Sequence, residues 1–437
     1  MKYAVVTFGC RVNQADSLGF EEELLGAGAV AAPPQDADVV IVNTCSVTAT
    51  ADQGARQTIR RIARDNPAAR IVVTGCYATR RPDEIAALPN VAQVVLNHDK
   101  PRLIQILREK TAKNAQIADK ILFSASSAIS AVPSLGDGPC GATIEPGVAG
   151  RTAFTLRVQT GCAESCSYCI IPTTRGLPRS VRVEDALRKV ERVTAAGFQE
   201  IALTGVHLGS YGRDLDPRSS LIELLRALDS GVAAMAGVLF RISSLEPMDC
   251  SREVVDLVAS SDRFAPHFHL PLQHASNRLL AAMRRPYTIE YYASLVDDIR
   301  SRIPNASIGS DIIVGFPGET DEDFEALAAY LEHSPLTHIH VFPYSDRPGT
   351  SASSMDDKVN GVVVRERGRR IREIAQRLSD RFRDAQVGTE HRALTLEDGT
   401  LAVTGNYLKV RIPPGQARNA WVRVRMTSHH DGELLAG

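Results

Sequence analysis

The chain has 437 residues, of which 44% are hydrophobic and 23% charged, and its net charge is -1. This length favours two to four domains, and the composition is typical of globular proteins. No apolar run approaches the about 18 residues of a transmembrane helix, and the N-terminus lacks the apolar core and cleavage site of a signal peptide, so we expect a cytoplasmic protein with no membrane partner.

The first hundred residues alternate short β-rich runs with amphipathic helical patterns. Strands are predicted at residues 2–8, 38–44, 70–75 and 91–96, and helices at 16–28 and 50–65. This alternation predicts a doubly wound parallel sheet with helices on both faces, which we assign to residues 1–110. Residues 111–150 lose the periodicity, are rich in Ser, Ala, Gly and Pro, and are predicted to be a linker.

A second α/β series occupies residues 151–385. Its β-rich runs are residues 153–159, 200–205, 238–244, 267–272, 307–316 and 338–344, with helical stretches such as 183–197 and 321–334 between them. Six strand–helix units predict a partial (β/α)6 barrel, whose chemistry would lie at the carboxyl ends of the strands. A long Arg-rich helix is expected at 365–383.

Residues 386–437 change to short alternating strands, which predict a small β-barrel. Residues from Gly361 to the end include 14 Lys and Arg and 9 Asp and Glu, which gives a net charge of +5. The rest of the chain therefore has a net charge of -6. A basic C-terminal part favours an anionic partner.

Three of the eight cysteines form a C-x3-C-x2-C pattern, namely Cys162, Cys166 and Cys169. In a reducing compartment, clustered cysteines are expected to be metal ligands or catalytic thiols rather than disulfides. A structural zinc needs four ligands, and no fourth cysteine or histidine lies nearby in the sequence, although a remote fourth ligand is an alternative. Three thiolates on a four-iron cluster would instead leave one iron open for a cofactor or substrate.

Cys10, Cys45 and Cys76 each follow a predicted parallel strand by a residue or two. Because the carboxyl ends of parallel strands meet in one crevice, these three loops predict a second metal site. The alternative, three unrelated small apolar side chains, would not place all three at equivalent strand ends. Cys140 and Cys250 lack such partners and are not expected to be ligands.

The C-x3-C-x2-C loop matches the signature of the radical S-adenosylmethionine superfamily, and the chain resembles the methylthiotransferases of that superfamily. The resemblance is carried in order by FGCRVNQADS, VNTCSVTATAD, TGCYA, CAESCSYCIIPTTRG, LTGVHLGSYG, ISSLEPMD, HLPLQHASNRLLAAMRRPYT, DIIVGFPGETDEDF and FPYSDRPGTSA. It implies two [4Fe-4S] clusters, one on each cysteine triad. The central cluster would cleave S-adenosylmethionine to a 5′-deoxyadenosyl radical, which removes hydrogen from an unactivated carbon. The open iron of the N-terminal cluster would handle the inserted sulfur, and a second S-adenosylmethionine would supply the methyl group.

The resemblance also suggests residues that bind S-adenosylmethionine. Tyr168 occupies the aromatic position between the last two cysteines, and Gly205 follows the second strand, where a plain turn is the alternative. Glu246 and Gln273 end later strands and could hold the ribose or carboxylate of the cofactor, with structural hydrogen bonding as the alternative. Asp311 begins the segment that corresponds to the fifth-strand motif of the family.

One loop departs from the family, which usually has Gln-Ser-Gly-Ser where this chain has Gln273-His274-Ala275-Ser276. His267, His269 and His274 are candidates for a metal site. We favour hydrogen-bonded or substrate-facing histidines, because the cysteines already provide metal ligands.

The last strands predict an RNA-binding face. One face is basic and aromatic, with Tyr407, Lys409, Arg411, Trp421, Arg423 and Arg425, whereas the intervening residues are apolar. Such a face can bind phosphates by charge and stack rings on bases, although an ordinary solvated face is an alternative. The segment resembles the TRAM domain of RNA-modifying methylthiotransferases, which favours tRNA as the partner.

The Cys-Arg-Val-Asn-Gln run after Gly9 is most similar to the branch that converts N6-threonylcarbamoyladenosine beside the anticodon to its 2-methylthio derivative. We therefore predict a tRNA methylthiotransferase of that branch, which binds the anticodon stem-loop and needs a sulfur source and an electron donor such as flavodoxin or ferredoxin. Alternatives are methylthiolation of N6-isopentenyladenosine in tRNA or of a ribosomal-protein aspartate. A rival from another class is a non-catalytic iron–sulfur protein that binds tRNA.

Overall fold

The computed structural model describes residues 1–114, 152–231, 237–396 and 398–437. The chain divides into two compact units, each considered by itself: Met1–Ile144 with Ile170–Leu177, and Glu145–Cys169 with Pro178–Gly437. Within the described ranges, no helix combines the length and apolar character that a membrane span requires.

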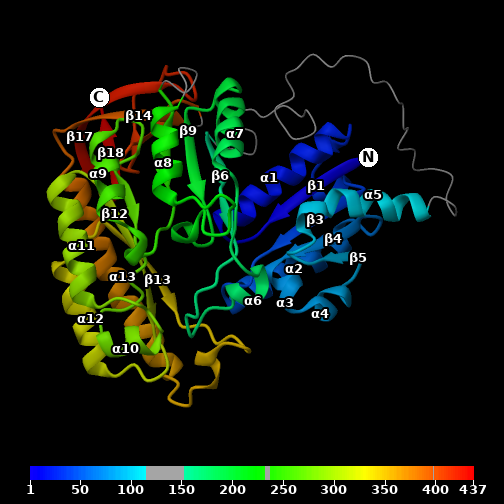
Figure 1. The fold of residues 1–437 in the computed structure, drawn as a ribbon, viewed down its shortest axis with the longest axis horizontal. Coiled ribbons are helices and arrows are strands. Elements are labelled where there is room, and N and C mark those ends of the chain that lie inside the picture. The colour runs from blue at the N-terminus through cyan, green and yellow to red at the C-terminus, as the bar shows by residue number, and fades with distance from the viewer. Residues whose placement is uncertain (115–151, 232–236, 397) are drawn as a thin grey trace. The chain divides into compact units, whose positions relative to one another are not determined.

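The N-terminal unit is built on a five-stranded parallel sheet in the order β2-β1-β3-β4-β5 (Figure 1). Its strands are β1 (Lys2–Thr7), β2 (Val30–Ala31), β3 (Val39–Thr44), β4 (Arg70–Gly75) and β5 (Val91–Val95). Its helices are α1 (Arg11–Gly26), α2 (Ala49–Asp65), α3 (Cys76–Arg80), α4 (Pro82–Ala86), α5 (Leu103–Asn114) and α6 (Ile171–Arg175), with 3-10 turns η1 (Pro34–Asp36) and η2 (Lys100–Arg102). The predicted doubly wound sheet is confirmed, with β2 as an additional short edge strand.

Helices cover both faces of this sheet because its strands are apolar on both sides. Ile59 of α2 and Tyr77 of α3 belong to the core on one face, and Phe20 of α1 and Leu107 of α5 to the core on the other. All six residues of β3 are buried, as is typical of a central parallel strand. The sheet order places β1, β3 and β4 side by side, so their carboxyl ends share one edge.

The predicted linker falls mostly outside the described residues, as does Cys140. Its first four residues are helical, because α5 continues to Asn114. Helix α1 begins at Arg11, five residues before the predicted start at residue 16.

The second unit contains the predicted six-stranded parallel half-barrel. Its parallel strands are β6 (Ala153–Arg157), β9 (Glu200–Thr204), β10 (Leu239–Ile242), β11 (His267–His269), β12 (Ser307–Val314) and β13 (His338–Pro343). They pair as β10-β9-β6 and β11-β12-β13, and a parallel bridge between Phe240 and Phe264 joins the two sets. A two-stranded ribbon, β7 (Gln159–Thr160) with β8 (Arg179–Ser180), lies next to the cysteine loop.

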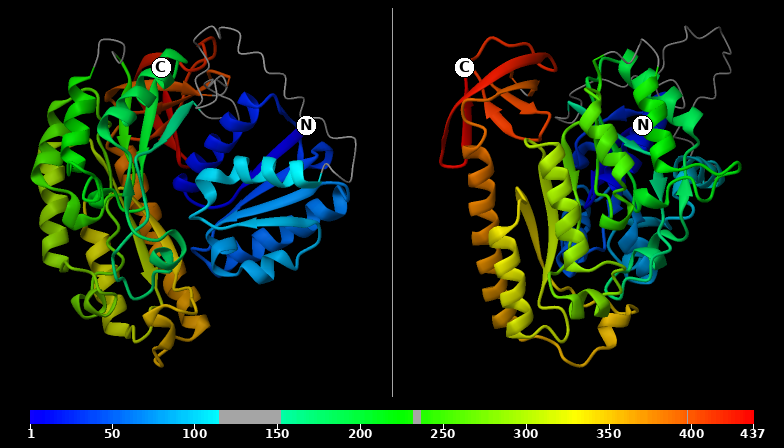
Figure 2. Two further views of the ribbon diagram at one scale, coloured as in Figure 1. Left: turned by 45° about the vertical axis from the view of Figure 1, so that its right-hand side comes forward. Right: turned by 60° about the vertical axis from the view of Figure 1, so that its left-hand side comes forward.

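Helices follow the strands of the half-barrel in the α/β pattern that the sequence predicts. They are α7 (Val183–Ala195), α8 (Leu221–Ser230), α9 (Arg252–Ser260), α10 (Asn277–Ala282), α11 (Ile289–Arg302), α12 (Asp321–His333) and α13 (Gly361–Asp384), with 3-10 turns η4 (Leu208–Ser210), η6 (Pro247–Asp249) and η7 (Ser351–Ser354). Helix α13 contains the predicted Arg-rich stretch. Figure 2 shows α13 leading into the C-terminal strands.

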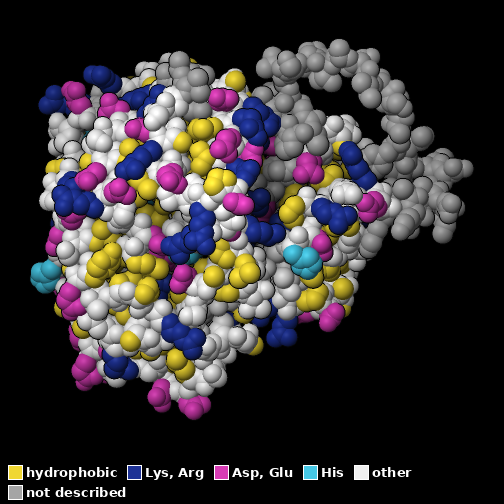
Figure 3. Space-filling view, viewed as in Figure 1, with side chains coloured by type: hydrophobic (Ala, Val, Ile, Leu, Met, Phe, Trp, Pro, Cys, Tyr) yellow, Lys and Arg dark blue, Asp and Glu magenta, His cyan; other side chains and the backbone are white. Residues whose placement is uncertain are grey.

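The C-terminal strands form a closed barrel in the order β14-β15-β16-β18-β17. They are β14 (Glu390–Leu396), β15 (Leu401–Thr404), β16 (Lys409–Arg411), β17 (Trp421–His430) and β18 (Glu433–Ala436). The core includes Val410, Val424 and Met426, so the predicted apolar face points inward. On the face of the molecule in Figure 3, basic and acidic side chains are interspersed, in keeping with a net charge of -1.

Candidate functional site

The N-terminal sheet brings Cys10, Cys45 and Cys76 to one edge. Cys10 is the N-cap residue of α1 after β1, Cys45 follows β3 directly, and Cys76 is the first residue of α3 after β4. Cys45 and Cys76 are buried, whereas Cys10 is exposed. Burial, with a smaller contribution from the neighbouring charges of Cys10 and Cys76, raises the pKa of Cys45 to about 11, so the three thiols lie within electrostatic reach of one another. We call them the N-terminal triad.

Gly9 lets two of these loops approach closely. Its φ of +88° lies in the left-handed region, and a Cβ built on it would overlap the Cβ and Sγ atoms of Cys45. Any other residue at this position would force the first loop of the triad away from the second.

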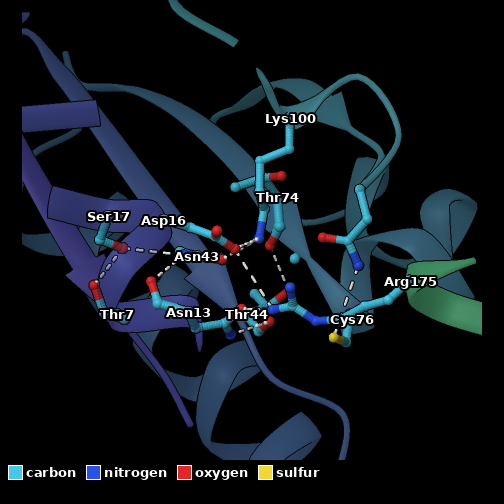
Figure 4. Close-up of polar contacts among 12 residues, drawn as sticks. Thr7, Asn13, Asp16, Ser17, Asn43, Thr44, Thr74, Cys76, Lys100 and Arg175 are labelled. Carbon is cyan, nitrogen blue, oxygen red and sulfur yellow. Dashed lines mark hydrogen bonds and ion pairs between the residues drawn. The ribbon is translucent and has the colours of Figure 1, made fainter. Parts of the chain in front are cut away.

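A buried polar network lies beside the triad and joins elements far apart in the sequence (Figure 4). Asp16 Oδ2 lies 2.8 Å from Lys100 Nζ and 3.5 Å from Arg175 Nη2. Arg175 Nη2 also donates to Asn13 Oδ1 at 2.5 Å, and Lys100 Nζ donates to Asn43 Oδ1 at 3.0 Å. Figure 4 shows the side chain of Arg175 reaching toward Cys76. Neither cation was singled out from the sequence.

The polar neighbours of the triad suit thiolates. Asn97 Nδ2 lies 3.7 Å from Cys76 Sγ and donates to Thr174 O at 2.8 Å. Burial opposes the charge of Arg175, but attraction to Cys76, Asp16 and Cys10 outweighs it and raises the pKa of the guanidinium. A fixed cation and an amide donor beside cysteine sulfur favour the ionised thiolate, the form that ligates metals. The residues present therefore fit a group held by three thiolates.

Cys162, Cys166 and Cys169, the central triad, lie in the loop between β7 and α6. The loop folds back on itself, because Cys169 N donates to Cys166 O at 3.2 Å. All three thiols are partly exposed, so a ligand could reach them.

Two basic side chains lie beside the central triad, and both were missed from the sequence. Arg285 Nη1 donates to Cys166 Sγ at 3.1 Å. Burial opposes the charge of His207, but the hydrogen bond to Asp249 and the neighbouring Cys162 outweigh it and raise the pKa of the imidazole to about 9. Like the N-terminal triad, this loop therefore combines thiols with nearby cations, which favour the thiolate form.

Glu246 and Tyr168 lie beside the same loop. The Glu246 carboxylate accepts a hydrogen bond from Arg285, whose Nε also donates to Tyr287 Oη at 3.1 Å. Tyr168 packs against the cluster of apolar residues around Met283, and burial raises the pKa of its hydroxyl well above its usual range. Their predicted contact with S-adenosylmethionine stays a prediction.

Gly205 and Gln273 occupy tightly constrained backbone positions. A Cβ on Gly205 would lie 2.8 Å from Leu208 Cδ2 and 3.0 Å from Gln159 Oε1, so protein atoms already fill that side of the glycine. Gln273 has a φ of +69°, and its N–H donates to Asp311 O at 2.9 Å. A non-glycine residue in this conformation is held by its surroundings, as is common at ligand sites.

Asp311 is the centre of a histidine group on the last three strands of the half-barrel. His269 Nε2 and His340 Nδ1 donate to Asp311 Oδ1 at 3.0 and 3.1 Å. Burial alone would raise the pKa of Asp311, but the two imidazoles lower it well below its usual range. The ligand atoms of the three residues lie within 4.8 Å of one another, and the ring of His338 lies 5.8 Å from that of His269. The sequence singled out Asp311 and His269 but not His338 or His340.

His274, the departure from the family pattern, is fully buried. Ser276 N donates to its Nδ1 at 3.0 Å, so the ring proton of the neutral form is on Nε2, which lies 3.8 Å from Glu319 Oε2. Burial lowers the pKa of His274 to about 4, although the Asp323 carboxylate opposes the shift. The residue is therefore neutral at pH 7 and serves the packing of the loop.

The predicted RNA-binding residues lie on the outer face of the C-terminal barrel, but its two rings already have partners. The Arg241 guanidinium lies 4.4 Å from the ring centroid of Tyr407, and that of Arg392 lies 3.8 Å from Trp421. Tyr407 also lies in a turn with a φ of +67° rather than within β16. The side chains of Lys409, Arg411, Arg423 and Arg425 are exposed.

Among these basic residues, ion pairs reduce the charge available to a partner. Arg411 Nη2 pairs with Glu433 at 2.8 Å, and Arg425 Nη1 lies 3.8 Å from Glu390. Surface pairs of this kind are weak and can exchange for phosphate.

A parallel half-barrel that carries a C-x3-C-x2-C loop at the carboxyl end of its first strand defines a radical S-adenosylmethionine enzyme. The model of the radical SAM superfamily matches residues 156–331, and that of the uncharacterized protein family UPF0004 matches residues 2–97. Among solved structures, the radical S-adenosylmethionine methyltransferase TsrM from Kitasatospora setae is similar in fold, with 17% sequence identity, a TM-score of 0.56, and coverage of 80% of this chain and 77% of that one.

Curated relatives are similar along nearly the whole length. The threonylcarbamoyladenosine tRNA methylthiotransferase MtaB of Aquifex aeolicus is 37% identical over 94% of this chain and 96% of the relative. The protein of the same name from Bacillus subtilis is 34% identical over 92% and 88%. The tRNA-2-methylthio-N(6)-dimethylallyladenosine synthase of Carboxydothermus hydrogenoformans is 33% identical over 90% and 87%. This chain belongs to the methylthiotransferase family of radical S-adenosylmethionine enzymes.

Proposed function

We propose that this enzyme converts N6-threonylcarbamoyladenosine in tRNA, beside the anticodon, to its 2-methylthio derivative. The observation that carries the proposal is the likeness along 94% of the chain to a relative named for that nucleoside. The relative named for dimethylallyladenosine is less similar, at 33% identity, and makes that nucleoside the second candidate.

Each cysteine triad would hold one [4Fe-4S] cluster and leave one iron without a protein ligand. When bound, the clusters and S-adenosylmethionine supply the radical, methyl and sulfur chemistry. The protein's part is to hold and orient these groups. Arg285 donates a hydrogen bond to Cys166 of the central triad, the His207 imidazole places a positive charge beside Cys162, and Arg175 places one beside the N-terminal triad.

The S-adenosylmethionine site would be formed around the carboxyl ends of the half-barrel strands. We include Tyr168 because it lies between two cysteine ligands, and Gln273 because its backbone is held in a rare conformation beside Asp311. Glu246 fixes Arg285 and so positions the donor to Cys166. Gly205 would contribute backbone shape only.

For tRNA we favour contact through charge on the outer face of the C-terminal barrel. Lys409 and Arg423 supply exposed cations for phosphates. Tyr407 and Trp421 would contribute less by stacking, because arginine side chains already lie over their rings. The enzyme would act in the cytoplasm and would need a sulfur source and an electron donor such as flavodoxin or ferredoxin.

Nucleoside analysis of tRNA from a gene-deletion strain tests the substrate. We expect loss of 2-methylthio-N6-threonylcarbamoyladenosine with accumulation of its unthiolated precursor, and restoration by the wild-type gene. Cys162→Ala should fail to complement because it removes a thiolate ligand of the central cluster. Cys250→Ala, which changes a buried cysteine outside both triads, should complement fully. Loss of the dimethylallyl counterpart instead would identify the second candidate as the substrate.

Assays on purified, reconstituted variants distinguish the roles of the two triads. With dithionite and S-adenosylmethionine, Cys162→Ala should form no 5′-deoxyadenosine. Cys45→Ala should still form it but should not methylthiolate tRNA, because its change is confined to the other triad. If Cys45→Ala retains methylthiolation, the N-terminal triad does not handle sulfur.

A further inference from the structure

We propose that Arg175 is a positioning residue of the N-terminal triad and that its positive charge stabilises the reduced, more negative state of the metal–sulfur group held there. The inference rests on the proposed second cluster. Arg175 follows the central triad in the sequence, but its electrostatic role would be toward the N-terminal triad.

Burial strengthens the electrostatic interactions between the charged groups of the network. Asp16 and Lys100 are each only 5% exposed, and Arg175 only 6%. Charges withdrawn from water act on neighbours through a lower effective dielectric than charges at the surface. A cation held at this depth beside three thiols therefore contributes to their electrostatic environment even at physiological salt, which screens buried charges far less than exposed ones.

The geometry fixes where the charge of Arg175 lies. Its Nη2 atom is held by Asn13 Oδ1 at 2.5 Å and faces Asp16 Oδ2 at 3.5 Å. Lys100 Nζ holds the same Asp16 oxygen at 2.8 Å from the other side. The carboxylate therefore lies between two cations, and only part of its charge offsets that of Arg175. Figure 4 shows this arrangement, with Arg175 next to Cys76.

The path of the chain explains why the role of Arg175 at the N-terminal triad is not evident from the sequence. Arg175 lies six residues after Cys169, the last cysteine of the central motif. Its segment, Ile170–Leu177, nevertheless groups with the N-terminal unit, and Thr174 O of the same helix accepts a hydrogen bond from Asn97. The residues that follow one cysteine group thus supply the cation beside the other.

The physical effect follows from charge. When the group on the triad accepts one electron from a reductant such as dithionite, it becomes more negative by one unit. A nearby fixed cation, and hydrogen bonding to sulfur, lower the free energy of that state and raise the reduction potential. A neutral side chain in place of Arg175 should therefore lower the potential. Removing the opposing Asp16 carboxylate should raise it.

The test uses the full-length chain with Cys162, Cys166 and Cys169 changed to Ala, so that only the N-terminal triad can hold a cluster. After anaerobic reconstitution with iron and sulfide, an EPR-monitored titration gives the midpoint potential. Arg175→Gln should make reduction at least tenfold less favourable, which is a shift of about 59 mV to lower potential for one electron. Asp16→Asn should shift the potential upward, and Arg175→Lys should keep most of the parent value.

Arg64→Gln is the matched control, because it removes one exposed positive charge at the far end of α2 and should leave the potential unchanged. Opposite shifts for Arg175→Gln and Asp16→Asn support the inference, because a purely structural loss would not reverse sign. Equal potentials with an intact cluster, or shifts in the same direction, overturn it. If Arg175→Gln holds no iron, Asp16→Asn and Arg175→Lys decide the question.

Failure of the proposed function gives different results. A parent chain whose N-terminal triad takes up no iron overturns the second cluster and this inference together. A wrong tRNA substrate would change nucleoside analysis but not these potentials.

Discussion

The buried ion pair between Arg241 and Glu200 gives the sharpest test of how the half-barrel carries the C-terminal barrel. Arg241 on β10 has no exposed surface, and its Nε donates to Glu200 Oε1 at 2.8 Å. Its Nη1 donates to Gly405 O at 2.9 Å in the C-terminal barrel, and its guanidinium lies over the ring of Tyr407. One side chain thus serves the core of the half-barrel and holds the neighbouring barrel against it.

Arg241→Met keeps the length of the side chain but leaves the Glu200 carboxylate buried without its cation. Removing one partner of a buried pair costs about 3–5 kcal/mol, most of which is the penalty of the uncompensated charge. Combining it with Glu200→Gln removes that penalty, so the double variant should be less destabilised than Arg241→Met alone. The coupling free energy should be at least about 2 kcal/mol.

Urea unfolding followed by tryptophan fluorescence provides the assay, because the chain has a single tryptophan. That residue, Trp421, lies in the C-terminal barrel, and its Nε1 donates at 3.2 Å to Oε1 of Gln199, which directly precedes β9 of the half-barrel. Arg226→Met is the matched control, because its pair with Glu253 is more than half exposed and should contribute less than about 1 kcal/mol. A loss for Arg241→Met as small as that of the control would refute the reasoning.

Three further predictions test the triad, the RNA face and the buried histidine. Gly9→Ala should reduce the iron of the reconstituted enzyme from about eight to about four atoms, because its Cβ would overlap a triad cysteine, whereas Gly28→Ala has open space and should bind iron normally. Equal iron in both variants would contradict this. Lys409→Ala with Arg423→Ala should weaken tRNA binding and reduce the salt slope by about 1.4–1.8, and an unchanged slope would place the RNA surface elsewhere. His274 has a pKa of about 4 when folded and about 6.5 when unfolded, so the unfolded state binds the proton first and acidification between these values destabilises the fold. Between pH 6.5 and pH 4, the unfolding free energy of the wild type should fall by about 3 kcal/mol more than that of His274→Gln. If the two proteins lose stability in parallel over this pH range, His274 does not cause the loss.

Sequence reasoning succeeded where topology constrains geometry. Cys10, Cys45 and Cys76 are distant in the chain, but each follows a strand of one parallel sheet, and carboxyl ends of neighbouring parallel strands must share an edge. The alternation of Lys409 and Arg411 with buried Val410 likewise follows from the two-residue period of a strand. In both cases a local pattern fixes which side chains can meet.

The residues that the sequence did not reveal depend on contacts between separate elements. Lys100 lies in a 3-10 turn 84 residues after Asp16, and no periodicity relates the two. In the sequence, Arg241 is a single charged residue in an apolar strand, and its burial is explained only by its partner Glu200 in the structure. His340 could have been found, because it repeats the alternation seen at His269 on the strand two places further along the chain.

Both cysteine groups have the same electrostatic arrangement although they lie in different units. Arg285 donates to Cys166 and is held by the Glu246 carboxylate, and Arg175 faces Cys76 and is held by Asp16. In each case a carboxylate fixes the arginine, so its charge would stay directed at sulfur without a side-chain rearrangement if a metal–sulfur group bound there gained an electron. A bound group that cycles between charge states is disturbed least by neighbours that do not have to move. If each triad holds the proposed cluster, this arrangement would favour electron transfer with little reorganisation.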